Sequence, residues 1–182
     1  LFILENEKKY LNITKDRINK NFSLKNLRVS FNYSEVQMVN YKGMFATEYK
    51  RLPLCNPDFI YLDGPDQFKI KNKINGFTIK HSDMMPMVSD ILKFEYFLIP
   101  GCMILVDGRG ANAKFLKDNL KRNWSYKHLK SFDQHLFILN DPSLGKINNN
   151  LIKFYRSYIF SFFTALLFSL IVSTNIDLVL LS

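Results

Sequence analysis

The chain has 182 residues, and 47% of them are hydrophobic, which is ample for the core of one domain. The formal net charge is +9, but the basic residues lie on every segment without an RNA- or DNA-binding motif. The charge therefore does not indicate a nucleic-acid partner, although it is compatible with acidic or phosphorylated substrates. Cys55 and Cys102 lack CxxC spacing and exclude a disulfide framework, which favours a reducing, cytoplasmic location. The three histidines, His81, His128 and His135, lack the spacing of a zinc motif.

The amino-terminal third is predicted to form strands around one helix, because short apolar or alternating runs flank a segment with helical spacing. The elements expected here are a buried strand (1–5) closing on Glu5, a helix (6–21), a strand (27–33) followed by Ser34 and Glu35, and a segment that fits either a short helix or a strand pair (36–49).

Two later segments share one pattern, a short apolar run that stops at Asp-Gly. Residues 57–62 lead to Asp63, and residues 101–106 lead to Asp107. A continuous apolar run of this length suits a strand buried on both faces, as in a parallel sheet. The carboxyl ends of such strands meet at the edge where α/β proteins bind ligands. The pattern predicts that Asp63 and Asp107 lie side by side at the rim of an active site.

The remaining segments complete an α/β pattern that ends in a hairpin. Such an order predicts an α/β fold, with a doubly wound, mostly parallel sheet and a terminal antiparallel hairpin. Residues 1–150 are expected to form this domain, and residues 151–182 an apolar helical tail. The further elements expected are a long polar loop (67–82), a helix (83–98), a helix (112–123) and two strands joined by a tight turn at Asp133 (126–132 and 134–139).

This order of elements resembles that of the class I S-adenosylmethionine-dependent methyltransferases, a Rossmann-like family in which parallel strands are followed by a terminal hairpin strand. The resemblance covers roughly residues 1–140. It is strongest in Asp-Phe-Ile-Tyr-Leu-Asp-Gly at 58–64, which resembles the family's fourth-strand motif, and at 100–107, which resembles its Pro-Gly-Gly-strand-Asp signature. It implies that Glu5 binds the cofactor ribose, that Ser34 and Glu35 lie near the adenine, and that the reaction methylates an oxygen or nitrogen of a small-molecule or sugar acceptor.

The chain lacks one part of this family pattern. The first strand and its glycine-rich loop, which would bind the amino-acid end of the cofactor, would precede Leu1. Leu1 begins inside an apolar run, so we expect the natural chain to extend further. As written, the chain is expected to bind S-adenosylmethionine poorly and to be inactive.

The two aspartates have three interpretations. Catechol-type O-methyltransferases hold a divalent cation with an Asp after strand four and an Asp-Asn after strand five. Asp63 and Asp107 match the aspartates, but Gly108 replaces the Asn, so two carboxylates with water would make a weak cation site. In the second interpretation the site is metal-free and one carboxylate is a general base or substrate anchor. In the third, Asp-Gly only starts a turn.

Two further residues have two interpretations each. Arg109 either binds a carboxylate or phosphate of the substrate or pairs with Asp63 or Asp107. His81 either acts near the acceptor, as a base or substrate-binding residue, or is a solvated loop side chain.

Residues 157–176 contain no charged side chain and are long enough to span a bilayer as a helix, with Lys153 and Arg156 just before them. This run favours a membrane anchor, whereas its serines, threonines and Asn175 favour an amphipathic or partner-binding helix. The alternative to a methyltransferase is therefore a non-catalytic α/β binding module tethered to the membrane by its tail. A dehydrogenase-type or nucleotide-sugar Rossmann enzyme is a third reading, against which the terminal hairpin argues.

Overall fold

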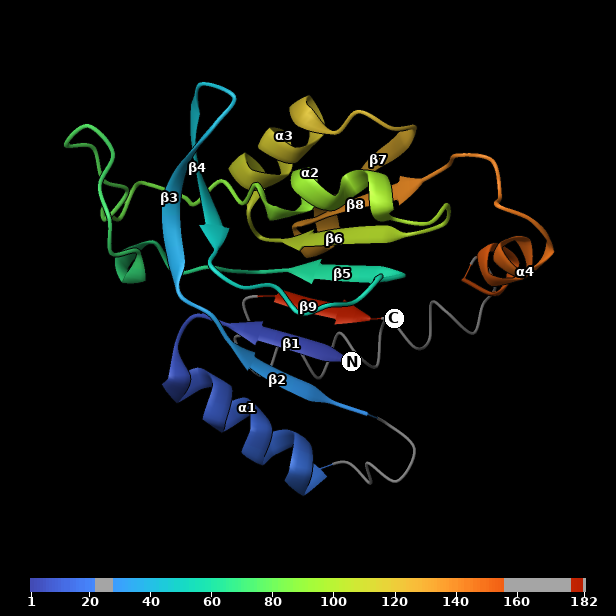
Figure 1. Ribbon diagram of the computed structural model, residues 1–182, viewed down its shortest axis with the longest axis horizontal. Helices are drawn as coiled ribbons and strands as arrows, with labels where there is room; N and C mark the ends of the chain where they lie inside the picture. Colours follow the sequence, from blue (N-terminus) through green and yellow to red (C-terminus); the bar gives the residue numbers. More distant parts are fainter. Residues whose placement is uncertain (22–27, 156–177, 182) are drawn as a thin grey trace.

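The computed structural model describes residues 1–21, 28–155 and 178–181 as a mixed α/β fold (Figure 1). The predicted run at 157–176 lies outside the described residues. The helices are α1 (Lys8–Asn21), α2 (Asp90–Phe94), α3 (Gly110–Asn119) and α4 (Lys146–Tyr155), with short 3₁₀ turns η2 (Gln67–Lys69), η3 (Glu95–Phe97) and η4 (Lys130–Phe132). The strands are β1 (Phe2–Glu5), β2 (Ser30–Tyr33), β3 (Val36–Tyr41), β4 (Met44–Tyr49), β5 (Phe59–Leu62), β6 (Met103–Asp107), β7 (Trp124–Leu129), β8 (Gln134–Leu139) and β9 (Leu178–Leu181).

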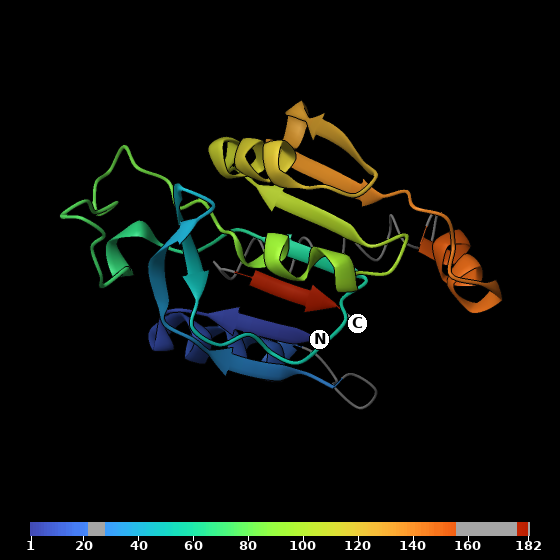
Figure 2. The same ribbon diagram turned by 45° about the horizontal axis from the view of Figure 1, so that its top comes forward.

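One sheet of seven strands runs through the fold in the order β2-β1-β9-β5-β6-β8-β7. The pairs β1–β2 and β5–β6 are parallel, whereas β9 pairs antiparallel with β1 and β5, and the hairpin β7–β8 is antiparallel within itself and to β6. The α/β class is therefore confirmed, but the sheet is mixed rather than mostly parallel. Figure 2 shows β9 lying between β1 and β5 from a second angle.

The segment 36–49, which fitted either a helix or a strand pair, is a strand pair. β3 and β4 form a separate antiparallel hairpin that turns at Lys42 and Gly43, both with positive φ. Two central residues with positive φ are what a tight two-residue hairpin requires. Buried side chains of this hairpin pack over one face of the large sheet.

The predicted helix 83–98 is wrong over its first half, because α2 begins only at Asp90. Pro86 lies inside the predicted helix and has no N–H to donate to it. The chain instead runs extended beside β4, where Thr47 N–H donates to Met87 O at 2.7 Å and Ser89 N–H donates to Thr47 O at 3.0 Å. Pairing with an edge strand replaces the helix at this point.

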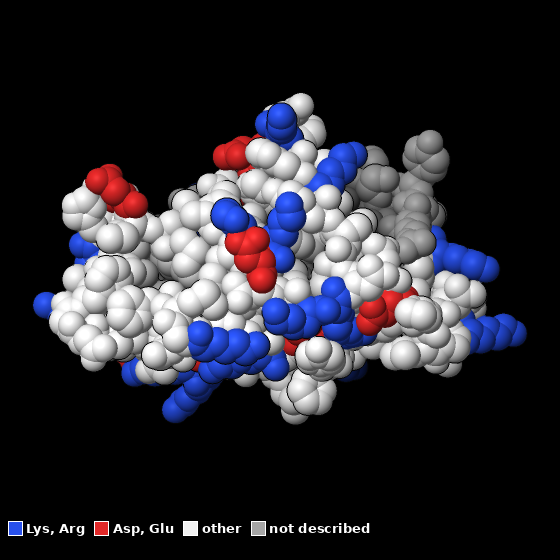
Figure 3. Space-filling model, turned by 90° about the horizontal axis from the view of Figure 1, so that it is seen from above, with Lys and Arg blue, Asp and Glu red and all other residues white. Residues whose placement is uncertain are grey.

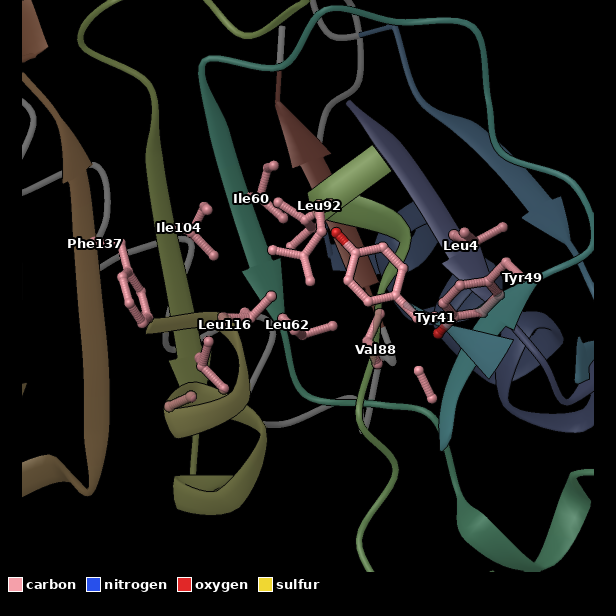
Figure 4. Packing of buried hydrophobic residues seen from close by; sticks show 14 of the residues in the cluster. Leu4, Tyr41, Tyr49, Ile60, Leu62, Val88, Leu92, Ile104, Leu116 and Phe137 are labelled. Carbon is pink, nitrogen blue, oxygen red and sulfur yellow. The ribbon is translucent and has the colours of Figure 1, made fainter. Parts of the chain in front are cut away.

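The core has a layer on each face of the sheet. α2, α3 and the β3–β4 hairpin cover one face, and Ile18 of α1 packs with Ile3 and Tyr61 on the other. β5 is buried along its whole length, as its uninterrupted apolar run predicts. Figure 4 shows the first layer, which includes Leu4, Tyr41, Tyr49, Ile60, Leu62, Val88, Leu92, Ile104, Leu116 and Phe137.

Charged side chains are scattered over the face of the molecule seen in Figure 3. Basic side chains are spread among uncharged ones, and acidic side chains lie beside several of them. On α3, Lys114 and Asp118 form an exposed ion pair at 2.8 Å. Exposed pairs of this kind contribute little to stability.

Candidate functional site

The predicted edge exists. β5 and β6 are parallel, and β1 and β5 are both antiparallel to β9, so all three strands point the same way. Leu62 pairs with Val106, and Asp63 and Asp107 are the residues that follow them. The prediction that the strands closing on Glu5, Asp63 and Asp107 end at one edge of the sheet is confirmed.

Asp107 is held by two neighbours that the sequence did not single out. The Tyr61 hydroxyl donates to Asp107 Oδ2, and Gln134 Nε2 donates to Asp107 Oδ1 at 3.2 Å. Tyr61 is fully buried, and burial followed by the hydrogen bond to Asp107 raises its pKa well above the ordinary value. Tyr61 therefore stays protonated and donates. Strand geometry could have identified both neighbours from the sequence. Tyr61 and Asp63 are two residues apart and so point to the same face of the sheet, and Gln134 lies opposite Asp107 on the paired strand.

Asp63 faces Arg109. Arg109 Nε lies 3.7 Å from Asp63 Oδ1, which is an ion pair rather than a hydrogen bond, and Arg109 Nη1 donates to Pro65 O at 3.2 Å. Of the two interpretations of Arg109, this geometry is the pairing with Asp63. A role for Arg109 in substrate binding stays a prediction, and it would require the guanidinium to exchange one carboxylate for another.

Glu5 is buried, with 2% of its surface exposed. Its Oε1 accepts a hydrogen bond from Glu7 N–H at 2.8 Å, at the turn that leads into α1. This position at the strand end is the expected one, but the carboxylate serves the helix entrance in this conformation. Glu5 as a ribose ligand stays a prediction.

Ser34 and Glu35 line a hollow of about 310 Å³ at the end of β2. Ser34 Oγ accepts a hydrogen bond from Arg51 N–H at 2.9 Å. Glu35 pairs with Lys50 and Lys71, and these hydrogen-bonded ammonium groups lower its pKa to about 2. The two residues therefore do lie together, beside basic side chains that follow β4 and η2. Among the described residues, the hollow is lined by Tyr33, Ser34, Glu35, Lys50 and Arg51.

His81 is not brought to the Asp63–Asp107 edge by any contact that the structure shows. It lies on the exposed loop after η2, and its Nδ1 is 3.6 Å from Asp83 Oδ2 and accepts a hydrogen bond from Asp83 N–H at 3.2 Å. This geometry is that of the solvated loop side chain. Its role toward an acceptor stays a prediction.

Asp63 and Asp107 have surroundings that suit hydrogen bonding better than a cation. Both Asp107 oxygens accept hydrogen bonds, and Asp63 faces a guanidinium. Over residues 1–21, 28–155 and 178–181, no third His, Cys, Asp or Glu ligand atom gathers with these two. Hard divalent cations require several oxygen ligands. The residues present do not fit a resident cation at this edge.

No protein-family model, curated protein or solved structure matches the chain. Among the described residues, no helix has the length and apolar character needed to cross a membrane.

Proposed function

We propose that this chain is the α/β core of an S-adenosylmethionine-dependent methyltransferase that acts on an oxygen or nitrogen of a small-molecule or sugar acceptor. The order of the sheet carries the proposal. Doubly wound sheets run 3-2-1-4-5 before their last strands. β2-β1-β9-β5-β6 reproduces this order with β9 in the first position, and the hairpin β8–β7 follows. Helices on both faces support the same assignment.

One structural feature supports cofactor binding, and three features oppose it. The hollow beside Ser34 and Glu35 lies where the resemblance expects adenine. Against this, β9 occupies the first-strand position in the antiparallel direction, and Glu5 is buried. Among the described residues no glycine-rich loop follows a strand at that position. We therefore expect weak cofactor binding by the 182-residue chain.

The acceptor side is the Asp63–Asp107 edge, without a metal. S-adenosylmethionine would supply the methyl group. An acceptor hydroxyl or amine here would pass its proton to Asp63, since both oxygens of Asp107 already accept hydrogen bonds from Tyr61 and Gln134. Asp107 is then the anchor that orients the acceptor.

The test is methyl transfer from radiolabelled S-adenosylmethionine by the natural polypeptide that contains these residues. Asp63→Asn is expected to lower the rate about a hundredfold, as for loss of a general base. Asp118→Asn, on the exposed face of α3, is the matched control and should keep full activity. Equal rates for both variants would refute the role of Asp63, and absence of cofactor binding would refute the class.

A second candidate function is that of a non-catalytic binding module. It is favoured because the acidic side chains of the proposed site already have partners within the protein. Asp63, Asp107 and Glu5 all make internal contacts that stabilise the fold. An apolar hollow of about 570 Å³ also opens beside residues 52–57, next to Phe94, Phe97 and Leu98. If this candidate holds, Asp107→Asn should lower the thermal midpoint while no cofactor binding is detectable in the wild type.

A further inference from the structure

The β7–β8 hairpin gathers two histidines and an aspartate whose sequence spacing does not match a zinc motif. His128 and His135 are direct cross-strand partners, and their rings stack with centroids 4.2 Å apart. Asp133 lies in the turn between them, 3.6 Å from His128 Nε2 through its Oδ1. One potential ligand atom from each residue lies within 4.8 Å of the other two.

The least exposed of the three side chains is held in a fixed orientation. His135 is buried, and its Nδ1 is 2.8 Å from the Tyr126 hydroxyl. Lys117 Nζ lies 4.5 Å from the centroid of the Tyr126 ring. With Nδ1 engaged, Nε2 is the ring nitrogen left for a ligand bond. A hydrogen bond to the second nitrogen is the usual way that proteins orient a metal-binding imidazole.

The backbone holds the turn that presents Asp133. Asp133 has φ 51°, in the left-handed region, and its carbonyl accepts a hydrogen bond from Gly108 N–H at 2.9 Å. His135 Nε2 points toward Gly110, where a β-carbon would come within 3.6 Å of it. A β-carbon there would be in ordinary van der Waals contact with Nε2, and glycine leaves this space unfilled. His128 and Asp133 are exposed, which gives an ion access from solvent.

We propose that His128, Asp133 and His135 bind a divalent transition-metal ion of the zinc class, with the fourth position open to water. Two imidazole nitrogens and one carboxylate oxygen favour zinc over magnesium or calcium, which prefer oxygen ligands. Around a tetrahedral ion these atoms lie about 3.3–3.6 Å apart, since the bonds are about 2.0–2.2 Å long. Rotation of the exposed His128 and Asp133 side chains would bring the three ligand atoms from within 4.8 Å of one another to this shorter separation.

The proposed zinc ligands are different residues from those of the acceptor edge, although the two sites adjoin: Gly108, which follows Asp107, donates its N–H to Asp133 O at 2.9 Å. Successive residues of a strand point to opposite faces, so Gln134 contacts Asp107 on one face while His135 contacts Tyr126 on the other. His128→Ala therefore removes a proposed zinc ligand without removing a residue assigned to methyl transfer. Failure of either proposal leaves the other standing.

Calorimetric titration of the 182-residue chain with zinc chloride tests the proposal, with cobalt(II) absorption as a second readout. One equivalent of zinc should bind, and cobalt should show the visible bands of a nitrogen- and oxygen-ligated site. His128→Ala, an exposed change, should weaken binding about tenfold or more, and Tyr126→Phe about tenfold.

The chain contains a matched control. His81 and Asp83 form another exposed His–Asp pair at the same 3.6 Å separation, and no third potential ligand among the described residues gathers with them. His81→Ala should leave zinc affinity unchanged. No zinc binding by the wild type, equal affinity in His128→Ala, or the same loss in His81→Ala would overturn the proposal.

Discussion

Tyr61 donates its hydroxyl hydrogen to Asp107 from a side chain that is entirely enclosed by protein. The bond joins β5 to β6 at the edge where both strands end. Because a buried donor without a partner costs free energy, this one contact links stability of the sheet to the geometry of the candidate site.

Tyr61→Phe should therefore destabilise the protein. Removing the hydroxyl leaves Asp107 with Gln134 as its remaining hydrogen-bond donor among the described residues. Loss of a hydrogen bond to a charged group costs about 1.5–3 kcal/mol, which urea unfolding would measure. Tyr96→Phe, at an exposed position, is the control and should change the free energy of unfolding by less than about 0.5 kcal/mol. A Tyr61→Phe variant as stable as the wild type would show that the bond is energetically neutral.

Asp90 is predicted to make stability fall as pH rises. Burial, and then the charge of Glu48, raise the pKa of Asp90 from 3.8 to about 8. The folded chain thus holds a proton between about pH 4 and 8 that the unfolded chain has released. The stabilisation is complete below pH 4, decreases by at most about 1.4 kcal/mol per pH unit, and is lost above pH 8.

Asp90→Asn isolates this contribution because asparagine has no charge to titrate. Its oxygen can still accept from Tyr49 N–H, which lies 3.2 and 3.3 Å from the two Asp90 oxygens. The difference in free energy of unfolding between wild type and variant, measured from pH 4 to 9, should change steadily in favour of the variant. Asp83→Asn, on an exposed loop, should show no such trend. Parallel curves for wild type and Asp90→Asn would contradict a raised pKa.

Gly101→Ala is predicted to be strongly destabilising. Gly101 has φ +93°, and a β-carbon there would lie 2.6 Å from Cγ1 of Ile152 on α4. The left-handed backbone costs an alanine about 1–2 kcal/mol, and overpacking adds about 1–3 kcal/mol. Gly43→Ala separates the two effects, because Gly43 has φ +83° with no atom within 4 Å. Thermal and urea unfolding should show the larger loss for Gly101→Ala, and equal losses would exclude close packing of α4 at this point.

The sequence predicted the features that depend on local patterns. Apolar runs closing on Glu5, Asp63 and Asp107 were sufficient to predict parallel strands with a shared edge. Features made by pairing between distant segments were not predictable in the same way. β9 enters the centre of the sheet, and residues 87–89 pair with β4 in place of a helix, through contacts that no local period encodes.

The histidine cluster shows the same limit. Zinc motifs are recognised by short spacings within a chain, whereas His128 and His135 meet because the hairpin turn sets them opposite each other. A turn of η4 followed by a left-handed Asp133 fixes that pairing. Spacing alone therefore could not find the cluster. Similarly, the sequence left Arg109 with two interpretations, substrate binding or pairing with an aspartate. The structure places its guanidinium beside Asp63 and Pro65 O.

The Asp63–Arg109 pair allows a test of whether Arg109 stabilises the fold or binds the substrate. A double-mutant cycle with Asp63→Asn and Arg109→Gln should yield a coupling free energy of about 0.5–1 kcal/mol, because both side chains are partly shielded from water. The exposed pair Lys114–Asp118 is the matched cycle and should give about 0.3–0.5 kcal/mol, falling with added salt. If the Asp63–Arg109 coupling is zero, the two charges do not stabilise each other. Arg109 is then free to bind an anionic group of the acceptor, and Arg109→Gln should raise KM without a change in stability.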